Sequence, residues 1–244
     1  MGCTRVKLQG YLVLGMILAL APELCPQTTP SPAEKSWANK NWTQWTREDC
    51  ISILLISPWT GYGSRGDRRD SPIPVFYSTH FSIHWLSARP VQQALIRLKQ
   101  IDNQYEEMAD AEKASFDAWA LGEFPPPGGD RVMVRVDERS FLSPLAGFGG
   151  LPYDALLVLG DGRIVLPQEI RRQPAPQGQP SGRMWVHQQI DVFFPRVVDG
   201  AALLKAGDTK VTVVVGRRSG ASFQVAARAE FKVTDMIYNG KLEY

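Results

Sequence analysis

The side chains of this chain best suited to acid–base or metal chemistry are three histidines, His80, His84 and His187. His80 and His84 fall in an alternating segment typical of a β-strand, where residues four apart are separated by about 13 Å. That separation is too large for both imidazoles to bind one metal ion, so we expect solvent-facing histidines and no metal or other cofactor. His187 lies four residues before Asp191, and these two form the first pair to inspect for catalysis.

The short motifs that usually carry catalysis are absent from the sequence. It contains no Gly-x-Ser-x-Gly nucleophile elbow, no Gly-Lys-Ser/Thr phosphate loop, no Cys-x-x-Cys and no His-Glu-x-x-His. The glycine-rich stretch 147–150 is followed by Leu151 and Pro152, which favours a turn over a dinucleotide-binding loop. We therefore predict a protein that is not an enzyme. The alternative is a hydrolase whose site is assembled from distant residues, with His187 or His84 beside a carboxylate.

Tryptophans gather around one short predicted helix and form the candidate interaction site: Trp42, Trp45 and Trp59. Thr46 and Asp49 can form a capping box at the start of this helix, and Ser57-Pro58 ends it near Ile56. The tryptophans could form a stacking platform for a sugar or peptide, or they could anchor the helix onto a larger core. The sequence leaves both alternatives open.

The start of the chain predicts an export signal. Arg5 and Lys7 precede an uncharged apolar run at 12–21, which is the order of a secretory signal peptide. As a helix this run is about 15 Å long, whereas a membrane span needs about 30 Å. Pro22 hinders cleavage directly after the run, and a lipid on Cys25 is an alternative that would tether the mature chain. We expect a periplasmic, cell-surface or secreted protein.

Composition predicts an ordinary globular body behind this leader. The chain has 44% apolar and 21% charged residues and a net charge of +2, too little positive charge to indicate nucleic-acid binding. Cys50 lies among apolar residues and is expected to be buried. The expected division is a signal peptide at 1–27, a Pro/Thr/Ser linker at 28–40, a Trp-rich N-terminal helix at 41–60, a loop at 61–74 and a β-sandwich at 75–244 with a helical insertion at 90–122.

Alternation of apolar residues predicts most of the β-strands. The expected strands are 75–86, 131–136, 155–159, 163–166, 184–194, 210–215 and 222–233. Asp161-Gly162 predicts a tight hairpin, and the composition of residues 171–183 predicts a loop. Residues 91–108 have the spacing of an amphipathic helix, and a second helical stretch follows at 111–121. Together these patterns predict a mainly β fold, an antiparallel immunoglobulin-like β-sandwich with an inserted α-helical pair and a short N-terminal helix.

Four stretches carry a resemblance to a known family: Trp42-Thr-Gln-Trp-Thr-Arg-Glu-Asp49, Ser57-Pro58-Trp59, His84-Trp85-Leu86-Ser87-Ala88-Arg89-Pro90 and the terminal Asp235 to Tyr244. They resemble an uncharacterised family of exported acidobacterial proteins, some of which are labelled GWxTD-domain-related. The Gly-Trp-x-Thr-Asp motif itself is absent from this chain. The resemblance implies a bacterial envelope location and a stand-alone domain, and it implies no activity.

These patterns predict an exported cell-envelope interaction or structural module that acts through its N-terminal helix, its inserted helical pair or both. Its expected partner is an envelope protein, with no nucleic acid, and with membrane contact only through an uncleaved or lipidated N-terminal segment. The alternative is a carrier of a small apolar ligand in which the inserted helices cover a pocket. An interaction module predicts an exposed apolar patch, a carrier predicts an enclosed apolar cavity, and a hydrolase predicts a cleft with a histidine beside a carboxylate.

Overall fold

The computed structural model describes residues 32–64, 79–124, 126, 128–142, 153–173, 184–219 and 222–244. The expected signal peptide at 1–27 and Cys25 lie outside the described residues, as do positions 65–74 of the expected loop. No helix in the described ranges is both long enough and apolar enough to cross a membrane.

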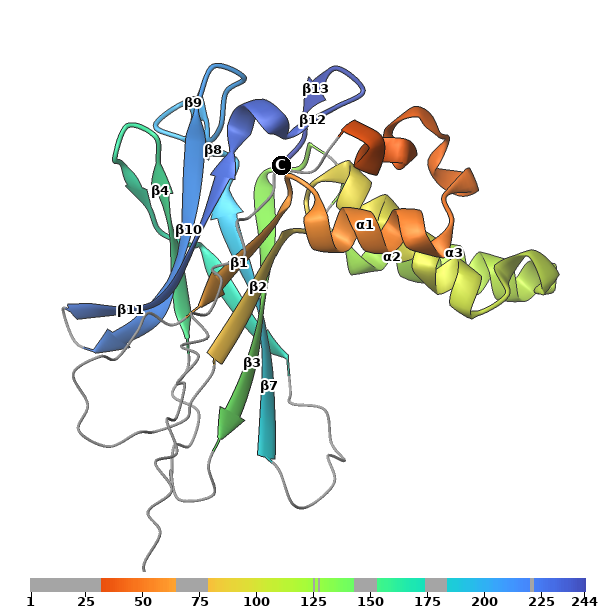
Figure 1. Ribbon diagram of the computed structural model, residues 1–244, viewed down its shortest axis with the longest axis horizontal. Coiled ribbons are helices and arrows are strands. Elements are labelled where there is room, and N and C mark those ends of the chain that lie inside the picture. Colours follow the sequence, from red (N-terminus) through yellow and green to blue (C-terminus); the bar gives the residue numbers. More distant parts are fainter. Residues whose placement is uncertain are drawn as a thin grey trace, which may run out of the picture.

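Two antiparallel sheets form the body of the protein (Figure 1). The larger sheet has the order β1 (Thr60–Ser64), β2 (Thr79–Trp85), β3 (Arg131–Leu142), β7 (Met184–Pro195), β6 (Glu169–Gln173). The smaller sheet has the order β11 (Ser222–Lys232), β10 (Lys210–Ser219), β4 (Asp154–Leu159), β5 (Ile164–Val165). Short two-stranded ladders join β8 (Val197–Val198) to β9 (Ala201–Ala202) and β12 (Ile237–Tyr238) to β13 (Lys241–Leu242). The expected mainly β, antiparallel architecture is confirmed, and the described strands do not close into a barrel.

The core lies between the two sheets because each contributes alternate apolar side chains to one face. In β2, Phe81, Ile83 and Trp85 are buried, while Ser82 and His84 lie on the opposite face, as the alternation predicts. The ring of Trp85 meets Phe231 of β11 edge-on at 5.6 Å, and Phe81 meets Tyr153, just before β4, at 5.4 Å. Aromatic side chains from both sheets therefore fill the core.

Glycines let β1 approach β11 closely at one corner of the two layers. A Cβ atom on Gly61 would lie 2.7 Å from Cζ of Phe231, and one on Gly63 would lie 2.7 Å from Cβ of Ala227. Glycine composition predicted a loop from residue 61, whereas residues 61–64 pair with β2. The glycines here permit a close approach between strands instead of marking a turn.

Three α-helices accompany the sheets: α1 (Arg47–Ile56), α2 (Arg89–Asp102) and α3 (Asp110–Glu123). The capping box predicted for α1 is present, since Thr46 Oγ1 accepts from Asp49 N at 3.2 Å and the Asp49 carboxylate accepts from Thr46 N at 3.0 Å. The predicted helix 91–108 ends early because Gln104 adopts a left-handed conformation, with φ of 52°, before the 3-10 turn η3 (Tyr105–Glu107).

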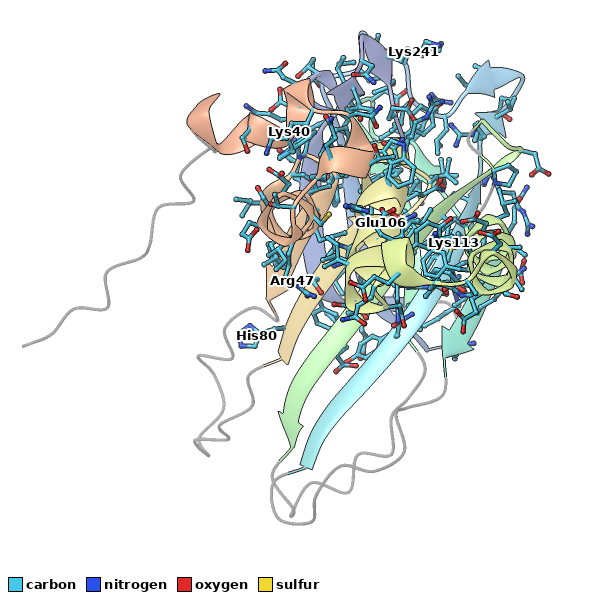
Figure 2. The ribbon with its side chains drawn as sticks, turned by 90° about the vertical axis from the view of Figure 1, so that its right-hand side faces the viewer. Lys40, Arg47, His80, Glu106, Lys113 and Lys241 are labelled. Atoms are coloured by element: carbon cyan, nitrogen blue, oxygen red, sulfur yellow. The ribbon has the colours of Figure 1, made fainter. Side chains whose placement is uncertain are left out.

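The inserted helices lie between β2 and β3 in the chain, as predicted, and they stand with α1 on one side of the larger sheet (Figure 1). The helix α1 packs against α2 and the start of β1, while α3 extends outward and buries none of its own residues. Strands β3 and β7 continue past the helical layer (Figure 2). The helices therefore cover only part of the outer face of this sheet.

Candidate functional site

Polar side chains form a row across the outer face of the larger sheet. The strand register places Thr60, His84, Arg135, Asp191 and Arg171 opposite one another, one from each strand. Directly opposed residues in antiparallel strands project from the same face of a sheet. This row therefore collects two guanidinium groups, one carboxylate, an imidazole and a hydroxyl on the face that carries the helices.

A buried ion pair stands at the centre of this row. Arg135 Nε donates to Asp191 Oδ1 at 2.7 Å and Nη2 donates to Oδ2 at 3.0 Å. The two side chains are only 17% and 3% exposed. Burial by itself lowers the pKa of Arg135, but the hydrogen bonds and charge of Asp191 outweigh it and leave the pKa raised. Such a two-point pair fixes β3 against β7 with one geometry.

This pair differs from the one the sequence suggested. The sequence suggested Asp191 with His187 because both fall on one predicted strand. The structure shows the Asp191 carboxylate bound to Arg135 of the neighbouring strand, and the pairing with His187 stays a prediction. The backbone of His187 lies opposite Arg139, and its side chain is outside the described residues. A charged residue in the middle of each alternating segment was the only local signal that could have indicated Arg135 and Asp191.

Beside the ion pair, a cleft of about 350 Å³ separates the end of α3 from the outer face of the sheet. Its charged lining residues are Glu123, Asp130, Arg131, Arg135, Arg171 and Asp191. Its apolar lining includes Phe124, Met133 and Phe193. The cleft is therefore polar around its wall, with apolar side chains among the charged ones, unlike the enclosed apolar cavity that a carrier would need.

Two further arginines of the cleft share one carboxylate. Arg131 Nη1 donates to Glu169 Oε2 at 2.8 Å, and Arg171 Nε donates to Glu169 Oε1 at 2.6 Å. The hydrogen bond from Arg171 is the main reason that the pKa of Glu169 is lowered. Both guanidinium groups also lie over the Phe193 ring, 5.1 and 4.5 Å from its centroid. Each arginine that lines the cleft thus has a carboxylate partner.

The histidines differ in their surroundings. His80 is exposed near the start of β2 (Figure 2), as expected for a solvent-facing residue. His84 is only 14% exposed, with Nε2 3.9 Å from Asp137 Oδ2 and Nδ1 3.5 Å from Thr60 Oγ1. Burial lowers the pKa of His84, and the charge of Asp137 opposes that shift. The expectation of a solvent-facing His84 was wrong because it packs beside β1, close to the end of α1.

The tryptophans predicted as an interaction site occupy two kinds of environment. Trp45 and Trp59 are each 1% exposed, and their indole nitrogens donate to the backbone oxygens of Trp37 and Glu243 at 3.0 and 2.8 Å. Trp42 is half-buried at η2 (Trp42–Gln44). Because the rings of Trp45 and Trp59 are covered, Trp42 is the one of these three tryptophans with ring surface that a ligand could reach from solvent.

A fourth tryptophan completes this cluster and was missed in the sequence. Trp37 lies in η1 (Pro32–Asn39), within the segment predicted as a linker, and is buried. Its ring lies 6.0 Å from Trp45, 6.1 Å from Trp59 and 6.3 Å from Tyr238 of β12. Composition alone predicted a solvated spacer, whereas Trp37 fastens η1 to both α1 and the C-terminal end of the chain.

The outward side of α1 is apolar as well as its inward side. Cys50 and Ile53 are buried against the body, while Ile51, Leu55 and Ile56 are 40 to 49% exposed. Tyr62 of β1 is equally exposed and donates from its hydroxyl to the Leu55 backbone oxygen at 2.7 Å. We call these four exposed side chains, Ile51, Leu55, Ile56 and Tyr62, the α1 patch.

Within the described residues, no group of three or more His, Cys, Asp or Glu side chains is placed to hold a metal ion. Cys50 is a buried free thiol, as expected, and burial raises its pKa to about 11. Comparisons with known protein families, with curated proteins and with solved structures found no match for the chain.

Proposed function

We propose that this protein is a non-catalytic interaction module of the bacterial cell envelope, exported by the segment 1–27. In this proposal the sheets form an immunoglobulin-like scaffold and the α1 patch is the surface that contacts an envelope protein. The resemblance to exported acidobacterial proteins and the order of charged and apolar residues at the start of the chain support the location.

The observation that carries the proposal is that α1 is apolar on both sides. A helix at the surface of a globular protein normally shows one apolar stripe and one polar face, whereas an all-round apolar helix is normally buried. In α1 the inward residues pack against the body, and Leu55 and Ile56 remain 48% and 49% exposed. A contiguous exposed apolar patch of this kind is typical of a contact surface between proteins.

The apolar-ligand carrier has less support from the same geometry. An apolar ligand in the cleft would displace water from three arginines and three carboxylates without replacing its hydrogen bonds. The free-energy cost of that loss favours a polar occupant.

One observation favours the hydrolase as a second candidate. The imidazole of His84 lies between a hydroxyl and a carboxylate. Its Nδ1 is 3.5 Å from Thr60 Oγ1, and its Nε2 is 3.9 Å from Asp137 Oδ2. However, Thr60 Oγ1 already donates to the Leu54 backbone oxygen at 3.0 Å, and His84 does not line the cleft. A hydroxyl committed to a helix carbonyl is poorly placed to act as a nucleophile.

Site-specific photo-crosslinking of the full chain in its native host tests the proposal. A photoreactive residue at position 55 should give one discrete adduct, whereas the same residue at position 121 should give none. Leu121 is a matched control because it is an exposed leucine on a different helix, α3, where it is 84% exposed. An adduct of twice the chain mass would identify a second copy as the partner in place of an envelope protein. Equal labelling at the two positions would contradict the proposal.

A further inference from the structure

We propose that the cleft between the end of α3 and the larger sheet binds a neutral, hydroxyl-rich ligand of the carbohydrate class. This inference goes beyond the proposed contact surface on α1 and does not depend on it.

The position and size of the cleft suit a small ligand. Its volume of about 350 Å³ falls within the usual range for such sites, about 300 to 1,000 Å³. Its walls come from the end of α3, the turn that follows and strands β3, β6 and β7. A site built mainly on strands holds its polar groups in fixed positions before a ligand arrives.

The charges around the cleft favour a neutral ligand. Three arginines and three acidic residues line it, and Glu169, which pairs with two of these arginines, adds a fourth carboxylate, so the positive charges are fully compensated. Arg135 is paired with Asp191, and Arg131 and Arg171 are both paired with Glu169. An anion would have to compete with these carboxylates for the guanidinium groups. A cation would have to approach the same three arginines, and a neutral ligand meets neither obstacle.

Hydrogen-bond donors remain on the sheet side of the cleft after these pairs are formed. Each guanidinium carries five N–H groups. Arg135 directs Nε and Nη2 to Asp191, and Arg171 directs Nε and Nη2 to Glu169. Within the described part of the chain, Nη1 of each of these two arginines has no hydrogen-bond acceptor. Both groups can therefore donate to a ligand oxygen.

Hydrogen-bond acceptors remain on the opposite, helical side. Glu123, the last residue of α3, lines the cleft and is exposed, and its charge acts on Arg135 of the sheet side. The last carbonyls of a helix also lack intrahelical donors, and no basic residue lies in the last turn of α3 to bind them. A hydroxyl group both donates and accepts, so a polyhydroxylated ligand can join the donors of the sheet to the acceptors of the helix.

The apolar lining of the cleft completes the match. Met133, Phe124 and Phe193 contribute nonpolar surface among the charged groups. A sugar ring presents hydroxyl groups at its edge and C–H groups on its faces, so it can use both kinds of surface. A fully polar ion would leave this apolar lining unused.

Calorimetric titration of the full chain with a panel of neutral trisaccharides of glucose, mannose, galactose and N-acetylglucosamine tests the inference. At least one should bind, with an affinity that changes less than about twofold between low and high salt, because a neutral ligand has no charge to screen. Glu123→Ala and Arg171→Ala should each weaken that binding by about tenfold or more, the usual effect of losing a hydrogen bond to a charged group. Glu107→Ala is the matched control, since Glu107 is an exposed glutamate outside the cleft, and it should bind like the wild type.

Two outcomes would overturn the inference. In the first, no trisaccharide binds to a protein whose circular dichroism confirms folding. In the second, glucose 6-phosphate or spermidine binds more tightly than every neutral sugar and loses affinity in high salt, which identifies an ionic ligand. Leu55→Glu, which alters the α1 patch, should leave sugar binding unchanged. Failure of sugar binding alone would therefore not contradict the proposed contact surface.

Discussion

Removing the carboxylate of Asp191 should be among the most destabilising single changes on the outer face of the larger sheet. In Asp191→Ala, the guanidinium of Arg135 loses both hydrogen bonds to Asp191 and the one carboxylate that binds it directly, while it remains only 17% exposed and keeps only the charges of Asp137 and Glu123 near it. Breaking a buried pair in this way typically costs about 3 to 5 kcal/mol. For a protein of this size each kcal/mol lowers the Tm by roughly 2 to 4 °C, so the expected decrease is roughly 6 to 20 °C.

The assay is urea unfolding of Asp191→Ala beside a surface control. Lys210 and Glu230 form an ion pair of similar length, 2.9 Å, on the β10–β11 hairpin, but both side chains are more than half exposed. Glu230→Ala should therefore cost no more than about 1 kcal/mol. The double variant Arg135→Met/Asp191→Leu should recover most of the loss, because neither charge is then left buried alone.

If Asp191→Ala and Glu230→Ala lower the free energy of unfolding equally, the reasoning is refuted. That result would mean that the Arg135 guanidinium reaches water when its partner is removed.

Four further outcomes follow from individual contacts. Gly63→Val should destabilise the protein by about 1 to 3 kcal/mol in urea unfolding, because its Cβ would lie 2.7 Å from Cβ of Ala227. Gly122→Ala should instead stabilise it by about 0.5 to 1 kcal/mol, since nothing lies within 4 Å of the added methyl group and alanine suits a helix better. The Cys50 thiol, with its pKa raised to about 11, should resist a thiol reagent at pH 8 until the protein is unfolded. Burial lowers the pKa of His84 from 6.5, so the unfolded chain binds the proton more readily than the folded protein does. The free energy of unfolding should therefore fall as the pH drops below about 6.5, and this decrease should be smaller in His84→Gln.

Local signals predicted the elements that are set by local chemistry. The bounds of α1 follow from Thr46 and Asp49 at its start and Pro58 after its end, and the structure has the same bounds. The hairpin between β4 and β5 follows from Asp161-Gly162, where Gly162 supplies a φ of 87°. These outcomes depend on a few neighbouring residues, and sequence spacing reports them directly.

Contacts between distant segments could not be predicted in this way. The glycines of β1 indicated a loop because their purpose depends on Ala227 and Phe231 of β11, far along the chain. Arg135 and Asp191 are 56 residues apart and meet only through the register of β3 and β7. Composition cannot fix a register, because one residue of slip would move either side chain to the other face of the sheet.

Thiol labelling inside living cells tests the central claim, that the α1 patch is covered by a partner, most directly. Cysteines introduced as Leu55→Cys and Leu121→Cys both replace exposed leucines, so in the purified protein a maleimide should react readily with both. The same labelling is then carried out in intact cells of the native host and quantified by mass spectrometry at each position. We expect the cysteine at position 55 to be protected from the maleimide and the cysteine at position 121 to react. Equal labelling of the two positions in cells would contradict this claim.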